Sequence, residues 1–155
     1  LRAGRIDEAL LRLEQARTIV TEIGAEHELV DIEARIAECR LFQGDPDGAL
    51  SLADAVLAKE GVSEAMERLS PHLHRVRGFA MLMQADPFGA REAFDLSLAS
   101  ARERKDLFET MRTLNALILL DGLEGVEPPQ EVVDESREVT AKLSIRAVPA
   151  VPSIA

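Results

Sequence analysis

A nine-residue segment that occurs twice constrains this sequence more than any other feature. The segment LFQGDPDGA at Leu41–Ala49 returns as LMQADPFGA at Leu82–Ala90, with six of the nine positions identical. A fainter copy opens the chain, where Leu1–Gly4 matches Leu41–Gly44. The spacing of about 40 residues is typical of repeat proteins, in which each unit buries its apolar face against its neighbours.

Each complete copy has the chemistry of a turn between two helices. Asp45 and Asp86 are good helix N-caps, and Pro46 and Pro87 follow at the first helical position, where the missing N–H costs nothing. After each turn, small or apolar residues recur every three or four positions, as in an amphipathic helix. With a further cap-and-proline start at Ser70–Pro71, these signals predict helices at about 5–23, 26–43, 46–59, 71–84, 87–104, 106–121 and 129–143.

Small residues are also placed where paired helices would cross. Ala37 precedes Ala49, and Gly78 precedes Ala90, by the same 12 positions. Small side chains at both sites would let the two helices approach closely. The aromatic residues are five Phe, without Trp or Tyr, so the core must come from aliphatic residues and Ala, which favours helices over a sheet. The predicted fold class is therefore all-α.

The composition excludes several classes of partner. The net charge of -10 argues against direct nucleic-acid binding, because such binding needs Lys and Arg to neutralise phosphates. The longest apolar run, Ala116–Leu120, is too short for a membrane span, and the sequence opens on an amphipathic pattern rather than a leader. The single cysteine, Cys39, fits a reduced core position. We therefore expect a cytoplasmic protein.

No residue pattern indicates catalysis. His72 and His74 are two positions apart, so on a helix they point in different directions and do not form a chelating pair. The loop Gly122–Gly125 carries an acid where a phosphate loop would need donors. Ser63 and Ser70 have no histidine and acid in a recognisable arrangement. The sequence predicts no catalytic residues, no metal site and no cofactor, and we expect that the chain is not an enzyme.

The small and large residues of the repeat resemble the tetratricopeptide signature, above all in Gly44–Leu50 and Gly78–Phe94. The period departs from the 34 residues of that family. Repeats of this longer kind are similar to those in the C-terminal regions of bacterial cyclase-like signalling ATPases and maltose-activator-type regulators. Leu73–Gly78 and Glu135–Pro152 resemble the cyclase-like group in particular. The resemblance implies a right-handed superhelical stack of antiparallel helix pairs, an α-solenoid of about seven helices.

The same resemblance implies a non-catalytic, protein-binding regulatory module of a larger bacterial signalling or transcription-regulatory protein. Its partner would be a protein or peptide segment, or the upstream domains of the same parent. The alternative is a sensor that holds a small effector in the concave groove. An enclosed pocket of convergent polar groups would favour the sensor, and an open groove would favour the protein partner. Detectable turnover would instead support an enzyme fragment.

The concave face of such a stack is its usual binding surface. Mapping the repeat onto it predicts seven partner-binding residues: Arg35, Glu38, Phe42, His72, Arg75, Phe79 and Met83. Two interpretations of Phe79 and Met83 stay open. With Arg75 they would form an anchor pocket with a charged rim for an amphipathic peptide, or they would belong to the core.

The two ends of the chain lead to separate expectations. Residues 1–143 form the predicted repeat domain, whose first helix would expose a stripe of Ala9, Leu13 and Ala16 that a second copy covers, giving a homodimer. Residues 144–155 form a proline-containing tail whose apolar residues and prolines recur every three positions, the period of a polyproline II helix. We expect this tail to lie against the final helices or on a neighbouring copy, with Val148 and Val151 most buried.

Overall fold

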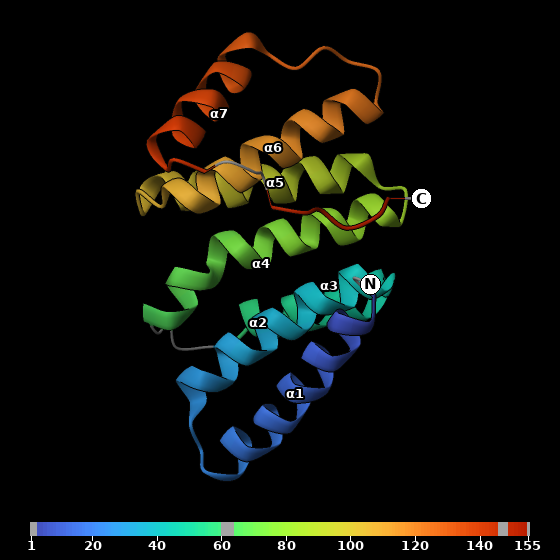
Figure 1. The fold of residues 1–155 in the computed structure, drawn as a ribbon, viewed down its shortest axis with the longest axis vertical. Coiled ribbons are helices and arrows are strands. Elements are labelled where there is room, and N and C mark those ends of the chain that lie inside the picture. The colour runs from blue at the N-terminus through green and yellow to red at the C-terminus, as the bar shows by residue number, and fades with distance from the viewer. Residues whose placement is uncertain (1–2, 60–63, 146–148, 155) are drawn as a thin grey trace.

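The computed structural model describes residues 3–59, 64–145 and 149–154, and side chains from Arg5 onward. Within these ranges the protein is all-helical, with seven helices and no strand (Figure 1). The all-α prediction is therefore confirmed. The helices are α1 (Ala3–Glu22), α2 (Glu26–Gln43), α3 (Pro46–Leu57), α4 (Glu64–Met83), α5 (Pro87–Glu103), α6 (Leu107–Leu123) and α7 (Gln130–Lys142).

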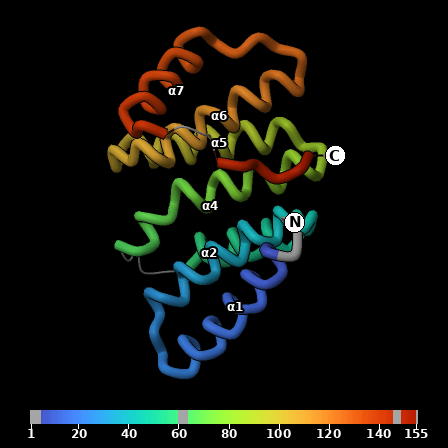
Figure 2. Tube along the Cα trace, viewed as in Figure 1, coloured from blue at the N-terminus to red at the C-terminus, as the bar shows by residue number. Residues whose placement is uncertain are grey.

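Neighbouring helices in the chain are also neighbours in space. Each helix packs on the next one, and in addition α2 packs on α4 and α4 on α6. The tube in Figure 2 shows the chain progressing in one direction, from α1 and α2 at one end to α6 and α7 at the other. Helices α2, α4 and α6 lie in a row, and we call the side of the molecule that they form the α2–α4–α6 face. In the part of the chain described, no helix is both long and apolar enough to cross a membrane.

The two predicted turns form as the sequence indicates. The carboxylate of Asp45 accepts a hydrogen bond from the Gly48 backbone N–H at 2.9 Å, and Asp86 accepts one from Gly89 at 2.9 Å. A proline occupies the first turn of α3 and of α5. Asp106 caps α6 in the same way, accepting from the Glu109 N–H at 3.0 Å. Local cap chemistry thus defines where three of the helices begin.

The predicted helix start at Ser70–Pro71 is wrong. Helix α4 begins at Glu64 and continues through Pro71, which lies buried inside it. Proline removes one helical hydrogen bond, but here its carbonyl oxygen accepts a hydrogen bond from the Ser97 hydroxyl of α5 at 2.7 Å. Thr113 of α6 lies 2.8 Å from the same hydroxyl oxygen. Burial and this polar link between three helices hold Pro71 in a position that local propensity disfavours.

The small residues predicted at the helix crossings are buried in the core. Ala37, Ala49 and Ala90 are fully buried, and Gly78 is also buried. The rings of Phe79 and Phe94 meet edge to face with centroids 5.2 Å apart. Because these alanines occupy little volume, adjacent helices can pack closely and the large rings fill the remaining space.

Helix α1 leaves apolar side chains at the surface, but only one of the three predicted ones is among them. Ala9 is exposed, and Leu13 and Ala16 are half-buried against the protein. The exposed large apolar side chains in this region are Leu11 and Ile19 of α1, and Ile23, which follows the helix. Most of the predicted stripe is thus partly covered within the chain, whereas Leu11, Ile19 and Ile23 remain outside. The predicted homodimer through this end stays a prediction.

The tail was expected against the final helices or on a neighbouring copy, and the described part of it lies beside the first two helices of its own chain. Ala150, Val151 and Ser153 line a hollow together with residues of α1 and α2, at the other end of the chain order. Val151 is 45% exposed, contrary to the prediction, while Pro152 is buried and Ile154 packs on the core. Val148 lies outside the described residues.

Candidate functional site

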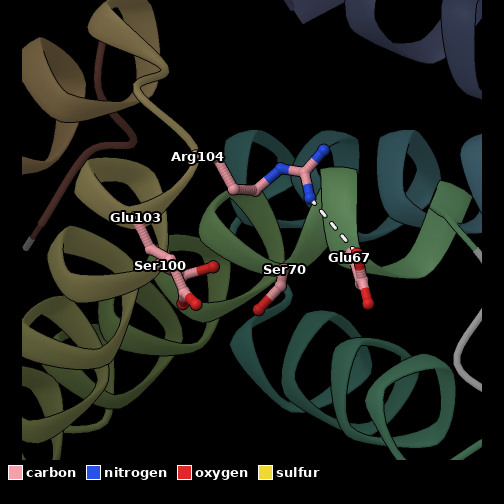
Figure 3. Close-up of a pocket in the computed structure, with 5 residues that line it drawn as sticks. All are labelled: Glu67, Ser70, Ser100, Glu103 and Arg104. Atoms are coloured by element: carbon pink, nitrogen blue, oxygen red, sulfur yellow. Dashed lines mark ion pairs between the residues drawn. The ribbon is translucent and has the colours of Figure 1, made fainter.

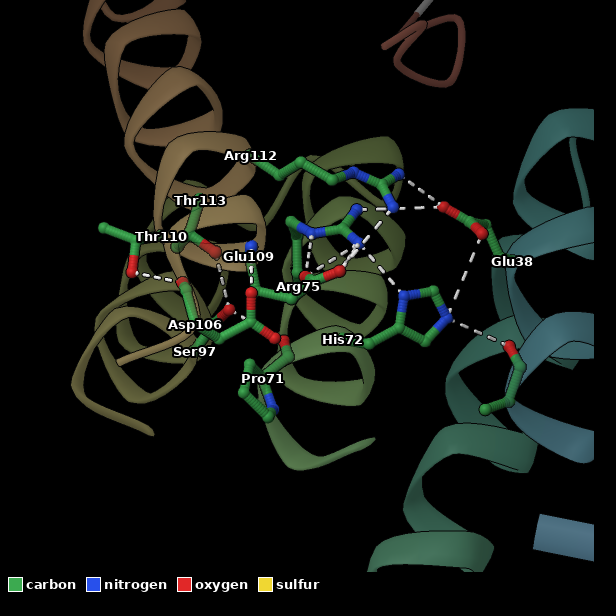
Figure 4. Close-up of polar contacts among 11 residues, drawn as sticks. Glu38, Pro71, His72, Arg75, Ser97, Asp106, Glu109, Thr110, Arg112 and Thr113 are labelled. Carbon is green, nitrogen blue, oxygen red and sulfur yellow. Dashed lines mark hydrogen bonds and ion pairs between the residues drawn. The ribbon is translucent and has the colours of Figure 1, made fainter. Parts of the chain in front are cut away.

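Five polar side chains from three helices meet on the α2–α4–α6 face. They are Glu38 of α2, His72 and Arg75 of α4, and Glu109 and Arg112 of α6 (Figure 4). We call them the polar cluster. Helical spacing explains the arrangement, because His72 and Arg75, like Glu109 and Arg112, are three residues apart and so lie on one side of their helix.

Arg75 is the buried centre of the polar cluster. Only 2% of it is exposed, and its Nε donates a hydrogen bond to Glu109 Oε2 at 3.2 Å. A second nitrogen, Nη1, lies 3.8 Å from Glu38 Oε1. Burial lowers the pKa of Arg75, and the neighbouring Glu109 carboxylate opposes that effect. The guanidinium therefore joins α4 to α6 and α2 through compensating charges.

The contacts of His72 define its protonation state. Its Nδ1 lies 3.0 Å from Arg75 Nη2, and its Nε2 lies 3.3 Å from the Ala34 carbonyl oxygen. A guanidinium only donates, so Nδ1 must accept and Nε2–H must donate, which is the neutral imidazole. Burial lowers the pKa of His72, and the positive charge of Arg75 lowers it further. His72 is thus a neutral link between the α2 backbone and the buried arginine.

Glu38 connects the polar cluster to the solvent side. Arg112 Nη2 donates to Glu38 Oε1 at 2.6 Å. Burial by itself raises the pKa of Glu38. The positive charge that His72 carries when it is protonated, together with the charges of Arg112 and Arg75, outweighs burial, so the pKa of Glu38 is lowered overall. The carboxylate stays ionised and pairs with two arginines from two helices.

Above the polar cluster lies a hollow of about 340 Å³, which we call the charged hollow. Phe108 on its border is 41% exposed, and the Arg112 guanidinium lies 5.7 Å from the centre of the Phe108 ring. Arg35 is exposed and forms no ion pair with any described residue. The lining residues are Asp31, Ala34, Arg35, Glu38, Arg68, Leu69, His72, Asp106, Phe108, Glu109 and Arg112.

Comparisons with protein-family models, with curated proteins and with solved structures found no match to this chain. A function for the α2–α4–α6 face must therefore be inferred from its own geometry.

The structure brings together four of the seven predicted partner-binding residues. Arg35, Glu38 and His72 line the charged hollow, and Arg75 lies beneath them. Phe42 lies further along α2 and lines the hollow beside the tail. These five predicted residues thus divide between two hollows that share helix α2.

The anchor pocket predicted from Phe79, Met83 and Arg75 does not form. Phe79 is 2% exposed and packs against Phe94, so it belongs to the core. Met83 is half-buried and packs against the same core. Because Arg75 pairs with Glu109, its charge does not form a rim at the surface.

Glu109, Arg112 and Phe108 were missed by the sequence reasoning. The nine-residue segment does not recur at the end of α6, so the repeat could not be mapped onto that helix. A weaker signal was present, because Asp106 followed three residues later by Glu109 resembles a helix-capping pattern. That pattern would have placed Glu109 and Arg112 on one side of the first turns of α6.

A second hollow, of about 450 Å³, lies between the start of α4 and the end of α5 (Figure 3). It is lined by Glu67, Ser70, Ser100, Glu103 and Arg104, and Arg104 pairs with Glu67 at 3.6 Å. Neither serine has a hydrogen bond to a histidine among the described residues. The described residues include no group of three or more acidic, His or Cys side chains placed to hold a metal ion.

Proposed function

We propose that this chain is a helical-repeat protein of the tetratricopeptide kind, and that it acts as a non-catalytic protein-binding and regulatory module in the cytoplasm. Two observations support the repeat. Residues with positive φ follow six of the seven described helices, and those after α2, α4 and α6, at Gly44, Ala85 and Gly125, are spaced like the repeated sequence segment. The even-numbered helices also contact one another, α2 with α4 and α4 with α6, whereas no contact joins the described residues of successive odd-numbered helices. This pattern is the one expected of stacked helix pairs.

The observation that carries the binding proposal is the border of the charged hollow. Phe108 offers an exposed ring and Arg35 an unpaired positive charge, one from α6 and one from α2. Between them the polar cluster fixes the three helices through ion pairs. A rigid surface with an exposed aromatic and a free arginine suits a protein segment that carries an apolar residue beside an acidic one.

The pairing of charges favours a protein segment over a small effector. Asp31 pairs with Arg68 at 2.8 Å, Glu38 pairs with Arg112, and Glu109 pairs with Arg75. These groups have already satisfied each other, so few of them are free to converge on a small polar ligand. The parent we propose, from the resemblance described above, is a larger bacterial signalling or transcription-regulatory protein.

The test is a selection of peptides from a displayed library on the immobilised full chain. We expect enriched peptides whose affinity falls about tenfold or more when an anchor is removed by Phe108→Ala or when its charge is reversed by Arg35→Glu. The matched controls are Phe88→Ala, since Phe88 is 73% exposed on α5, and Arg137→Glu on α7. A library that yields no specific peptide, or peptides that bind all four variants equally, would contradict the proposal.

A further inference from the structure

The course of the tail brings the end of the chain back to its first helices. After α7 the backbone turns at Ser144, which has a φ of 53°. Residues 149–154 then run without helix or strand across the front of the molecule, in the view of Figures 1 and 2. They line a hollow of about 650 Å³, which we call the tail hollow. Its lining residues are Arg5, Ile6, Ala9, Cys39, Phe42, Ala150, Val151 and Ser153.

The tail hollow and the charged hollow are both bordered by helix α2. Glu38 lines the charged hollow and the next residue of α2, Cys39, lines the tail hollow, followed one turn later by Phe42. The two regions differ in chemistry, since the helix residues that line the tail hollow are apolar apart from Arg5 and Cys39. A segment lying along α2 would therefore pass from a charged region to an apolar one.

Apolar contacts hold the tail in place. Pro152 is buried and Ile154 packs against the core. Among the described residues, positions 149–154 make no hydrogen bond to a helix. An extended segment anchored by two apolar side chains, without hydrogen bonds, can be exchanged for another segment of the same chemistry at small cost.

We propose that residues 149–154 are an internal occupant of the partner-binding surface, and that the partner segment is extended, uncharged and proline-containing where it crosses the tail hollow. The proposal rests on the proposed function and specifies the apolar half of that surface. A tethered segment acts at an effective concentration near the millimolar range, so the tail lowers the apparent affinity for any competing partner. Release of the tail would then be the step that exposes the site.

The chain carries its own reporter for this step. Cys39 is its single cysteine, is half-buried, and lines the tail hollow. A thiol reagent can reach it more easily once the tail has left. The rate of Cys39 modification therefore measures tail release without any partner.

The experiment compares the full wild-type chain with Ile154→Asp, which places a charge where Ile154 packs on the core. Ser144→Asp is the matched control, because it adds the same charge at an exposed turn position where Asp tolerates the positive φ. One readout is the rate of Cys39 modification by an aromatic disulfide reagent. The other is fluorescence anisotropy of a labelled synthetic peptide with the sequence of residues 144–155.

We expect Ile154→Asp to react about tenfold faster at Cys39 and to bind the peptide about tenfold more tightly than the wild type, with Ser144→Asp unchanged. Circular dichroism checks that the variant is folded, and Ile154→Ser serves as a milder replacement if it is not. Equal rates and equal peptide affinity in the wild type and the variant would overturn the proposal. Protection of Cys39 in a wild-type dimer but not in the wild-type monomer would also overturn it, because the tail would then occupy a second copy.

The failure of this inference differs from failure of the proposed function. If library peptides bind through Phe108 and Arg35 and bind the wild type and Ile154→Asp equally, the competing tail is wrong and the interaction module stands. If Cys39 becomes reactive in Ile154→Asp but the variant binds neither the tail peptide nor any library peptide, the tail docks on a surface that recognises no partner. The latter result overturns both proposals.

Discussion

The ring of Phe94 lies directly on the bare Cα of Gly78. A Cβ added at Gly78 would be 2.3 Å from Phe94 Cε1, and Phe94 is fully buried against Phe79. Helices α4 and α5 therefore meet at a point where one residue must lack a side chain. Glycine destabilises a helix when it lies in the interior of that helix, so the glycine here is explained by packing rather than by helix propensity.

Replacing Gly78 by Ala should destabilise the protein, although alanine is the better helix former. The added methyl would displace a buried ring that has no free space, at a cost of about 1–3 kcal/mol. Gly122→Ala is the control, because a Cβ at that helical position meets nothing within 4 Å. It should stabilise the protein by up to about 1 kcal/mol. Urea unfolding of both variants checks the pair, and a stable Gly78→Ala variant would contradict the packing.

Glu109→Gln should leave the buried Arg75 without its main counter-charge. Arg75 lies 3.1 Å from Glu109 and 3.8 Å from the partly exposed Glu38, so Glu38 compensates incompletely. We expect a loss of about 3 kcal/mol in the free energy of unfolding, because removal of one partner strands a buried charge. Glu92→Gln, at an exposed position on α5, should change little. Equal stability of the two variants would show that the polar cluster is not a structural link.

The stability of the protein should fall in mildly acidic solution because of His72. Burial lowers the folded-state pKa of His72 below its ordinary value of 6.5. Above about pH 6.5 the imidazole is neutral in both states, so its contribution is fully present there. As the pH falls from 6.5 through the folded pKa, the unfolded state gains the proton first, and stability drops by up to about 1.4 kcal/mol per pH unit.

His72→Gln tests this assignment, because an amide can donate to the Ala34 carbonyl and accept from Arg75 without titrating. The pKa of His74 is also lowered by burial and acts in the same direction, so the difference between wild type and variant isolates His72. His27→Gln is the exposed control. Unfolding free energies measured between pH 5 and pH 8 should diverge below about pH 6.5 for His72→Gln alone. Parallel curves would remove His72 from the explanation.

Ala85→Gly should stabilise the protein by about 0.5–1 kcal/mol. Ala85 has a φ of 61°, a left-handed conformation that glycine adopts freely, and Gly44 holds the corresponding place after α2 with a φ of 80°. The reciprocal change, Gly44→Ala, should destabilise by a similar amount although its Cβ meets nothing within 4 Å. Thermal unfolding measures both shifts, and a lower midpoint for Ala85→Gly would contradict the expectation.

Local chemistry in the sequence was enough to place most of the helices. Asp45, Asp86 and the prolines that follow them act over three or four residues, so their effect does not depend on the rest of the chain. Pro71 carries the same kind of signal and was misplaced, because its burial and its hydrogen bond to Ser97 come from another helix.

Whether a helical residue faces the core or the surface was decided only by the tertiary structure. Periodicity placed Phe79 and Arg75 on the same side of their helix and left open whether that side faces a groove or the core. The packing of α4 against α5 turned Phe79 inward, and Glu109 of α6 fixed Arg75.

The position of the tail shows the same limit over a longer distance. Its apolar spacing indicated that it would dock, but Ile154 and Pro152 pack where helices far away in the sequence leave an apolar surface. Cap chemistry is short-range and can be read from adjacent residues. Burial depends on which surfaces meet, and those surfaces exist only once α1, α2 and α4 have assembled.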